Sequence, residues 1–308
     1  MIDETLTKVE MAPEPAAPAA RAGRPARSYW RESWERLRGN RLGMVAGGVI
    51  LALAVIALTA PLISTYITHY DPTRQDLANN FDFPGRIHWL GSDELGRDTL
   101  TRLVYGAQIS LGVGFLTVLI QLTFGAAIGL IAGYYGRLVD DVLMRIVDVI
   151  LAFPPIFLFI GLAILFRPST LTLSLIIASV GWGAVARLVR GEVLSIRNRD
   201  FMLASRSIGA RDTRLMLGHL LPNAMPVMIV AASLALGQII LIEAALDFLG
   251  LGIQPPTASW GNMLTNAQTY FVHSAWLVIF PGITIFITVL AANLFGNAVR
   301  DAFDPRLR

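Results

Sequence analysis

Two pairs of ionisable residues lie within apolar stretches of the sequence. Glu243 and Asp247 are four residues apart and Arg145 and Asp148 are three apart, so each pair would share one helix face. Ionisable side chains within a membrane often serve function. For Arg145 and Asp148 we favour a local ion pair with a snorkelling arginine over a ligand contact. Because two acids on one face repel, we expect Glu243 and Asp247 near water or a basic partner, in a structural role, with a vestibule or subunit contact as alternatives.

Several chemistries are excluded or disfavoured by residue types. The chain has no cysteine and four scattered histidines, so thiolate chemistry is excluded and no metal site is predicted. A Gly-x-Ser-x-Gly motif is absent, which argues against an intramembrane hydrolase. Lys8 is the single lysine and has no glycine-rich loop around it, so the chain cannot carry a P-loop ATPase site. No nucleic-acid surface is predicted from the net charge of +3.

Composition places these residues in a membrane protein. The 308 residues are 54% hydrophobic and 15% charged, whereas about a quarter of a soluble domain is charged. Three stretches lack any Asp, Glu, Lys or Arg, and they cover 42–70, 103–136 and 248–299. About 20 apolar residues suffice for a helix to cross a bilayer. The sequence therefore predicts an all-α integral membrane fold.

Six membrane spans are expected, with both termini on one side. The predicted spans are 43–66, 107–133, 142–165, 170–190, 222–247 and 275–297. Arginines concentrate before the first span, in the 191–221 loop and at the C-terminus, whereas 249–274 carries no charge. The positive-inside rule then places both termini and the 191–221 loop in the cytoplasm.

The segments around these spans give further expectations. Residues 1–41 form a cytoplasmic, partly disordered tail, with an interfacial helix over 28–41 or a simple helical lead-in to the first span as alternatives. A first span at 42–66 and an outer loop at 67–103 precede a five-helix domain at 104–298, and 299–308 is a cytoplasmic end. Gly125, Gly129 and Gly133 align on one helix face, which favours close helix packing. The outer segment 249–274, with Trp260, is expected against the bilayer or a partner.

The 191–221 loop is polar yet patterned as a helix, a turn and a second helix. Asp200 can cap a helix whose apolar positions include Phe201 and Met202. Gly209 interrupts that helix, and Asp212 stands near the start of the next one. The apolar side of this unit needs a partner.

This loop resembles the coupling loop of binding-protein-dependent ABC importers. That motif has Glu-Ala-Ala, three residues, Gly, and Leu-Pro about a dozen residues further on. Ala204, Gly209, Leu221 and Pro222 match it, Ser205 replaces the second alanine, and Leu203 replaces the acidic residue. The resemblance implies ATPase coupling through Ala204, Ser205, Arg206, Gly209, Ala210, Arg211 and Asp212.

Other segments resemble the C-type permease subunit of the peptide/nickel importer family. The likeness runs from about residue 36 to the end, and its motifs are HWLGSDELGRD at 88–98, GYYGRLVDDVLMRIVDVILAFP at 133–154, EAALDFLGLG at 243–252 and DAFDPRLR at 301–308. The sequence differs from the family pattern at two places. Asp247 stands where a small polar residue is more usual, and Asn297-Ala298 stands where Asp-Gly is expected.

The resemblance implies a type I ABC importer permease fold in a bacterial inner membrane. It implies a second, homologous permease chain, two ATPase subunits that hold ATP and Mg²⁺, and an extracytoplasmic binding protein. Docking of that binding protein is expected at Asp93, Glu94, Arg97 and Asp98. Peptide is the expected cargo, with nickel chelates, opines or oligosaccharides as alternatives. A stand-alone secondary transporter is the competing class, but it would be expected to show internal repeats.

Overall fold

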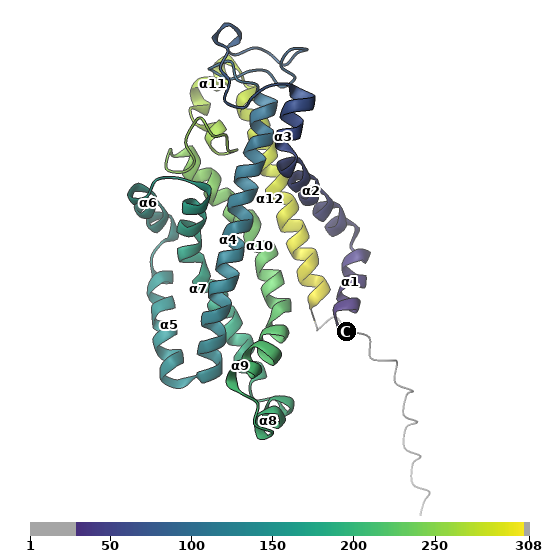
Figure 1. Ribbon diagram of the computed structural model, residues 1–308, viewed down its shortest axis with the longest axis vertical. Coiled ribbons are helices and arrows are strands. Elements are labelled where there is room, and N and C mark those ends of the chain that lie inside the picture. The colour runs from purple at the N-terminus through teal and green to yellow at the C-terminus, as the bar shows by residue number, and fades with distance from the viewer. Residues whose placement is uncertain (1–28, 305–308) are drawn as a thin grey trace, which may run out of the picture.

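The computed structural model describes residues 29–304 and contains helices and no strands within that range. The predicted disordered segment and Lys8 lie outside the described residues. Five helices are long and apolar enough to cross a membrane, and a bent pair makes up a sixth candidate span. The long helices run side by side, with loops at one end and a small helical unit projecting from the other (Figure 1). We call these the loop end and the α8 end.

The chain enters through two helices separated at Asn40. Helix α1 (Tyr29–Gly39) precedes α2 (Arg41–Leu58), whose N-terminus is capped by Asn40 through a 2.9 Å bond from the Gly43 N–H to its side chain. A short helix α3 (Ala60–Ile63) and a π-helical turn (Ser64–Thr68) continue α2 beyond Thr59. Leu37 of α1 packs against the end of the last helix, whereas Trp30 and Trp34 stay partly exposed. An interfacial position for α1 remains a prediction.

Two long helices form the centre of the fold. Helix α4 (Thr99–Tyr135) is capped by Asp98, whose carboxylate accepts the Thr101 N–H at 2.8 Å, and α7 (Thr170–Ile196) is capped by Ser169. The glycine stripe on α4 faces α7, so the close neighbour lies in this same chain. A methyl group at Gly129 would lie 2.5 Å from the Ala186 carbonyl oxygen. Only hydrogen allows this approach of the two backbones.

The predicted third span is broken. Instead of one helix over 142–165, α5 (Arg137–Ala152) and α6 (Pro155–Leu165) meet at 87°. Pro154 and Pro155 stand at the break, where proline removes N–H donors and forces the preceding residue out of the helical region. The stretch 142–165 is long and apolar enough for one span despite Arg145 and Asp148, and the two prolines override that pattern.

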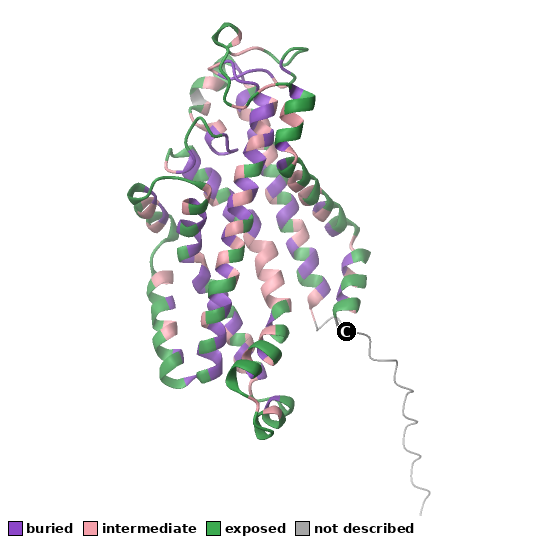
Figure 2. Ribbon diagram, viewed as in Figure 1, coloured by how far each residue is buried: buried purple, intermediate pink, exposed green. Residues whose placement is uncertain are grey.

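The remaining helices complete the bundle. Helix α10 (Leu221–Phe248) and helix α12 (Trp276–Phe303) pack together, and α12 also packs against α2. A 3₁₀ turn (Asn262–Leu264) and α11 (Ala267–His273) lie between them at the loop end, and a 3₁₀ turn (Leu77–Asn79) lies in the first long loop. Residues coloured as buried concentrate where helices face one another, whereas the outward faces are coloured mainly as exposed (Figure 2). Exposed apolar residues such as Leu58, Leu138 and Leu165 suit a surface that faces lipid or partner chains.

Candidate functional site

The projecting unit at the α8 end contains the predicted coupling residues. Helix α8 (Asp200–Ser207) is followed by a turn at Gly209, whose φ of +83° is one that glycine adopts without strain. Helix α9 (Asp212–Leu215) then continues through a π-helical turn (Met216–Leu220) into α10. The cap prediction is wrong in detail, because Arg199 occupies the N-cap position and Asp200 is the first helical residue. Its acid still lies favourably in the first turn of α8.

Apolar contacts fasten this unit to the bundle. Met202, Leu215 and Leu220 are fully buried in one cluster with residues of α4 and α7. The joint between the projecting unit and the bundle is therefore rigid, because the two short helices share a packed core with two membrane helices.

Polar contacts fix its orientation. The Tyr134 hydroxyl at the end of α4 donates to Asp212 Oδ1 at 2.6 Å, and the Arg206 guanidinium lies 5.5 Å from the centre of the Tyr134 ring. The Arg197 side chain donates to the Gly133 carbonyl oxygen at 3.0 Å. Arg206 and Asp212 therefore have contacts within the chain in addition to their exposed surface.

The outward side of the unit is partly apolar. Ala204, Arg206, Gly209, Arg211 and Asp212 are exposed, and Ser205 and Ala210 are half-buried, so the structure brings the predicted coupling residues onto one projection. Three larger apolar side chains stand beside them, with exposed fractions of 40% for Phe201, 48% for Leu203 and 86% for Ile208. Sequence reasoning did not single out Ile208, although an isoleucine directly before a turn glycine in a polar loop was the available signal.

The charges of α5 pair differently from the prediction. Asp148 forms its ion pair with Arg187 of α7, with an Nη2–Oδ1 distance of 2.7 Å, and not with Arg145. Arg145 and Asp148 are both exposed on α5. Asp140, which sequence reasoning missed, binds Arg190 of α7 through both carboxylate oxygens, one of them 2.6 Å from Nη2. These contacts join α5 to α7, since pairing between neighbouring helices satisfies both charges.

Glu243 and Asp247 are buried in the protein interior. Their side chains are 0% and 1% exposed, and no described basic residue pairs with either, so the expectation of nearby water or a basic partner is wrong. Ser110 of α4 donates to Glu243 Oε1 at 3.0 Å, while Glu243 Oε2 has no hydrogen-bond partner among the described residues. The acid thus takes its hydroxyl donor from a neighbouring helix, with Asp247 one turn away on its own helix.

Asp247 organises the segment that follows α10. Its Oδ1 accepts the Ile253 N–H at 2.6 Å, and its Oδ2 accepts the Ser259 hydroxyl. Asn262 closes the same segment by donating to the Thr257 carbonyl oxygen at 2.8 Å. Trp260 is fully buried and donates to the Leu103 carbonyl oxygen at 3.0 Å, so it packs inside this chain and not against lipid or a partner. The segment folds back because buried carboxylate oxygens need donors.

The four residues expected to dock a binding protein form an internal network instead. Asp93, Arg97 and Asp98 are buried, and only Glu94 is partly exposed. The Arg97 guanidinium binds Asp93 at 2.7 Å and Glu94 at 2.8 Å, and Asp98 accepts from Thr101 while lying 3.0 Å from His88. These side chains shape the loop and leave little surface for a partner.

Two family profiles match the chain. The profile described as "Binding-protein-dependent transport system inner membrane component" matches residues 125–308. The profile described as "N-terminal TM domain of oligopeptide transport permease C" matches residues 28–84. The first match begins within α4 and includes all of the projecting unit, and the second match lies before α4.

Curated relatives extend the similarity along nearly the whole chain. A "Dipeptide transport system permease protein DppC" of Alkalihalophilus pseudofirmus is 41% identical over 97% of each chain. A "Glutathione transport system permease protein GsiD" of Pectobacterium atrosepticum is 38% identical over 92% of this chain and 93% of its own. An "Oligopeptide transport system permease protein OppC" of Bacillus subtilis is 36% identical over 96% of this chain and 97% of its own.

Proposed function

We propose a function from one premise: the chain belongs to the family of binding-protein-dependent transport system inner membrane components. Membership confirms the resemblance to C-type peptide permeases and makes the chain a multi-pass transport permease subunit. Within that role, we infer that it forms half of the pathway of an ATP-driven peptide importer. A second permease chain forms the other half, two ATPase subunits supply the energy, and an external binding protein delivers the peptide.

The projecting α8–α9 unit is the observation that carries the energy-coupling proposal. Phe201, Leu203 and Ile208 are exposed on this unit, and exposed apolar residues on a polar projection suit docking to another protein. Leu203 stands where related motifs carry an acid, so the contact there is apolar and not ionic. ATP binding would move the docked unit, and the buried cluster around Met202 and Leu215 would pass the movement to α4, α7 and α10.

Arginine distribution supports the orientation of the proposal. Arg197, Arg199, Arg206, Arg211 and Arg214 all lie in or beside the unit, which places the α8 end in the cytoplasm by the positive-inside rule. Helix α1 and the end of α12 both lie in the half of the bundle that is nearer the α8 end (Figure 1). The loop end then faces the binding protein.

The names of the relatives support a peptide cargo. They are named for dipeptides, glutathione and oligopeptides, which share free charged ends and a peptide backbone. We therefore propose short peptides as the cargo of the complex to which this chain belongs.

The coupling proposal is tested by placing charge on the apolar outward side. Ile208→Asp and Ala204→Arg should each reduce co-purification of the ATPase subunits and ATP-dependent peptide uptake by about tenfold or more, because a charge buried at a contact is left unpaired. Asp141→Arg is the matched control, since it makes a large charge change at an exposed site of α5 outside the unit. Normal ATPase retention and uptake in both test variants would refute the coupling assignment.

A further inference from the structure

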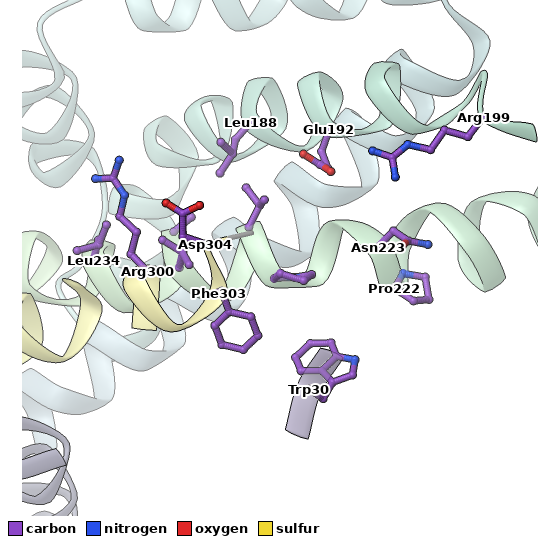
Figure 3. Close-up of a pocket in the computed structure, with 14 residues that line it drawn as sticks. Trp30, Leu188, Glu192, Arg199, Pro222, Asn223, Leu234, Arg300, Phe303 and Asp304 are labelled. Carbon is purple, nitrogen blue, oxygen red and sulfur yellow. The ribbon is translucent and has the colours of Figure 1, made fainter. Parts of the chain in front are cut away.

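A large cavity opens at the α8 end between three membrane helices. It has a volume of about 800 Å³ and lies between the end of α7, the first half of α10 and the end of α12, with Trp30 of α1 at its border (Figure 3). Most of its wall is apolar, and α10 contributes half of the lining residues, among them Pro226, Val227 and Val230. Cavities of roughly 300–1,000 Å³ are of the size that holds small-molecule ligands.

Charged side chains of both signs reach this cavity from opposite walls. Glu192 and Arg199 extend from the α7 side, while Arg300 and Asp304 extend from the end of α12 (Figure 3). Glu192, Arg199 and Arg300 form no ion pair with any residue from 29 to 304. By contrast, α5 and α7 are joined by ion pairs at Asp140 and at Asp148. Three charges without an ion pair in the described part of the chain thus line one cavity.

The arrangement of charges selects a class of ligand. A simple anion would meet Glu192 and Asp304, and a simple cation would meet the two arginines, so each would experience repulsion as well as attraction. An apolar ligand would make no use of the charged groups. Each wall carries one acid and one arginine, so a zwitterion can place its ammonium beside an acid and its carboxylate beside an arginine. The apolar wall between them accepts side chains of varied shape, because apolar packing has no preferred direction.

We propose that this cavity holds the two charged ends of a short peptide, with Glu192 binding the terminal ammonium and Arg300 binding the terminal carboxylate. The inference rests on the proposed function, because it names the part of this chain through which the peptide would pass. Arg199 supplies a second cation beside the same space. Binding at this end of the bundle is the step before release from the α8 end.

The test uses the intact transport complex in proteoliposomes and a photoreactive dipeptide, alanyl-photoleucine. Crosslinks mapped by mass spectrometry should fall on cavity residues such as Val227 and Val230. Unlabelled dialanine should suppress these crosslinks about tenfold better than N-acetyl-dialanine or dialanine amide, because each derivative loses one charged contact worth about tenfold in affinity.

Two variants separate the two ends of the ligand. Glu192→Gln should abolish the preference for a free amino end and keep the preference for a free carboxyl end, and Arg300→Gln should do the reverse. Asp301→Asn is the matched control, since this exposed acid follows Arg300 and does not line the cavity. It should retain both preferences.

The outcomes distinguish this inference from the proposed function. Crosslinks confined to sites outside the cavity, or both preferences retained in Glu192→Gln and Arg300→Gln, would overturn the inference while ATP-dependent peptide uptake by the wild-type complex persists. Absence of that uptake in the wild-type complex would overturn the proposed function itself. A fold defect in either variant is detected by its assembly with the partner subunits, and Glu192→Asp, which keeps the charge, should then restore the preference for the free amino end.

Discussion

At the residue scale, Glu243 and Asp247 show that equal spacing does not give equal roles. Both are buried on α10, but Asp247 accepts a backbone N–H and a hydroxyl from the segment it closes, whereas Glu243 accepts one hydroxyl from α4. Asp247 thus acts mainly through its geometry as an acceptor. The contacts use both carboxylate oxygens, whereas a neutral amide offers one acceptor oxygen, and the acid lies near a second one.

This distinction predicts different results for two substitutions of Asp247. Asp247→Leu should lower the free energy of unfolding by about 1–3 kcal/mol, because the buried Ile253 N–H loses its acceptor. Asp247→Asn keeps an acceptor for that N–H and removes a buried charge, but its NH2 group cannot accept the Ser259 hydroxyl, so its loss of stability should be clearly smaller than that of Asp247→Leu. The thermal unfolding midpoint of the purified complex measures both. If Asp247→Asn were as unstable as Asp247→Leu, the charge and not the acceptor geometry would hold the segment.

Residue types predicted the location of these groups but not their partners. The sequence pointed to Asp93, Arg97 and Asp98 as charged groups in a loop, and the fold buries them against one another. Likewise, Asp148 pairs with Arg187, which lies 39 residues further along the chain, because α5 packs beside α7. Helical spacing indicates only neighbours on one helix, so contacts between helices had to await the tertiary structure.

At the element scale, the contact between α4 and α7 depends on small residues at specific positions. Gly129 faces the backbone of α7, whereas a methyl group at Gly112, on the same helix, would have Thr170 Cγ2 as its nearest atom, 3.8 Å away. The two glycines have the same intrinsic cost in a helix, so a comparison between them isolates packing from helix propensity.

Gly129→Ala should destabilise the protein while Gly112→Ala should not. The added methyl group at Gly129 would lie 2.5 Å from a carbonyl oxygen, so the helices must separate, at a cost of about 1–3 kcal/mol. Gly112→Ala should be neutral or stabilising by up to about 1 kcal/mol, because alanine favours a helix. Detergent-extracted variants heated in parallel and quantified by size-exclusion chromatography give the comparison. Equal melting of the two variants would mean that the seam tolerates a wider spacing.

The elements themselves were largely predictable, and the exceptions have physical causes. Long apolar stretches gave the places of α2, α4, α7, α10 and α12, because bilayer thickness sets a minimum length. The break between α5 and α6 follows from Pro154 and Pro155, a local signal that a count of apolar residues does not weigh. The helix–turn–helix form of the projecting unit was predictable from pattern and resemblance, but the cavity was not, since its walls come from separate helices whose packing the sequence pattern does not specify.

At the scale of the whole molecule, the projecting unit and the cavity share structural elements. The cluster that buries Met202 and Leu215 includes Ala224 at the start of α10, and the cavity wall begins at Pro222 on the same helix. Movement of α8 would therefore tilt the first half of α10 and change the shape of the cavity. This connection gives the proposed ATP-driven step a direct mechanical route to the proposed peptide site.

The orientation of the whole molecule yields a prediction that the absence of native cysteine makes simple to test. Gln75→Cys lies in the exposed part of the loop end, and Thr213→Cys lies on exposed α9. In intact spheroplasts, a membrane-impermeant maleimide should label Gln75→Cys and leave Thr213→Cys unlabelled, because the proposed orientation places the arginine-rich α8 end in the cytoplasm. Lysis should expose Thr213→Cys to the reagent, which controls for its reactivity, and the cysteine-free wild type controls for specificity. Labelling of Thr213→Cys before lysis, with Gln75→Cys protected, would show the opposite orientation. The α8–α9 unit would then lie outside the cell, where no cytoplasmic ATPase could dock to it.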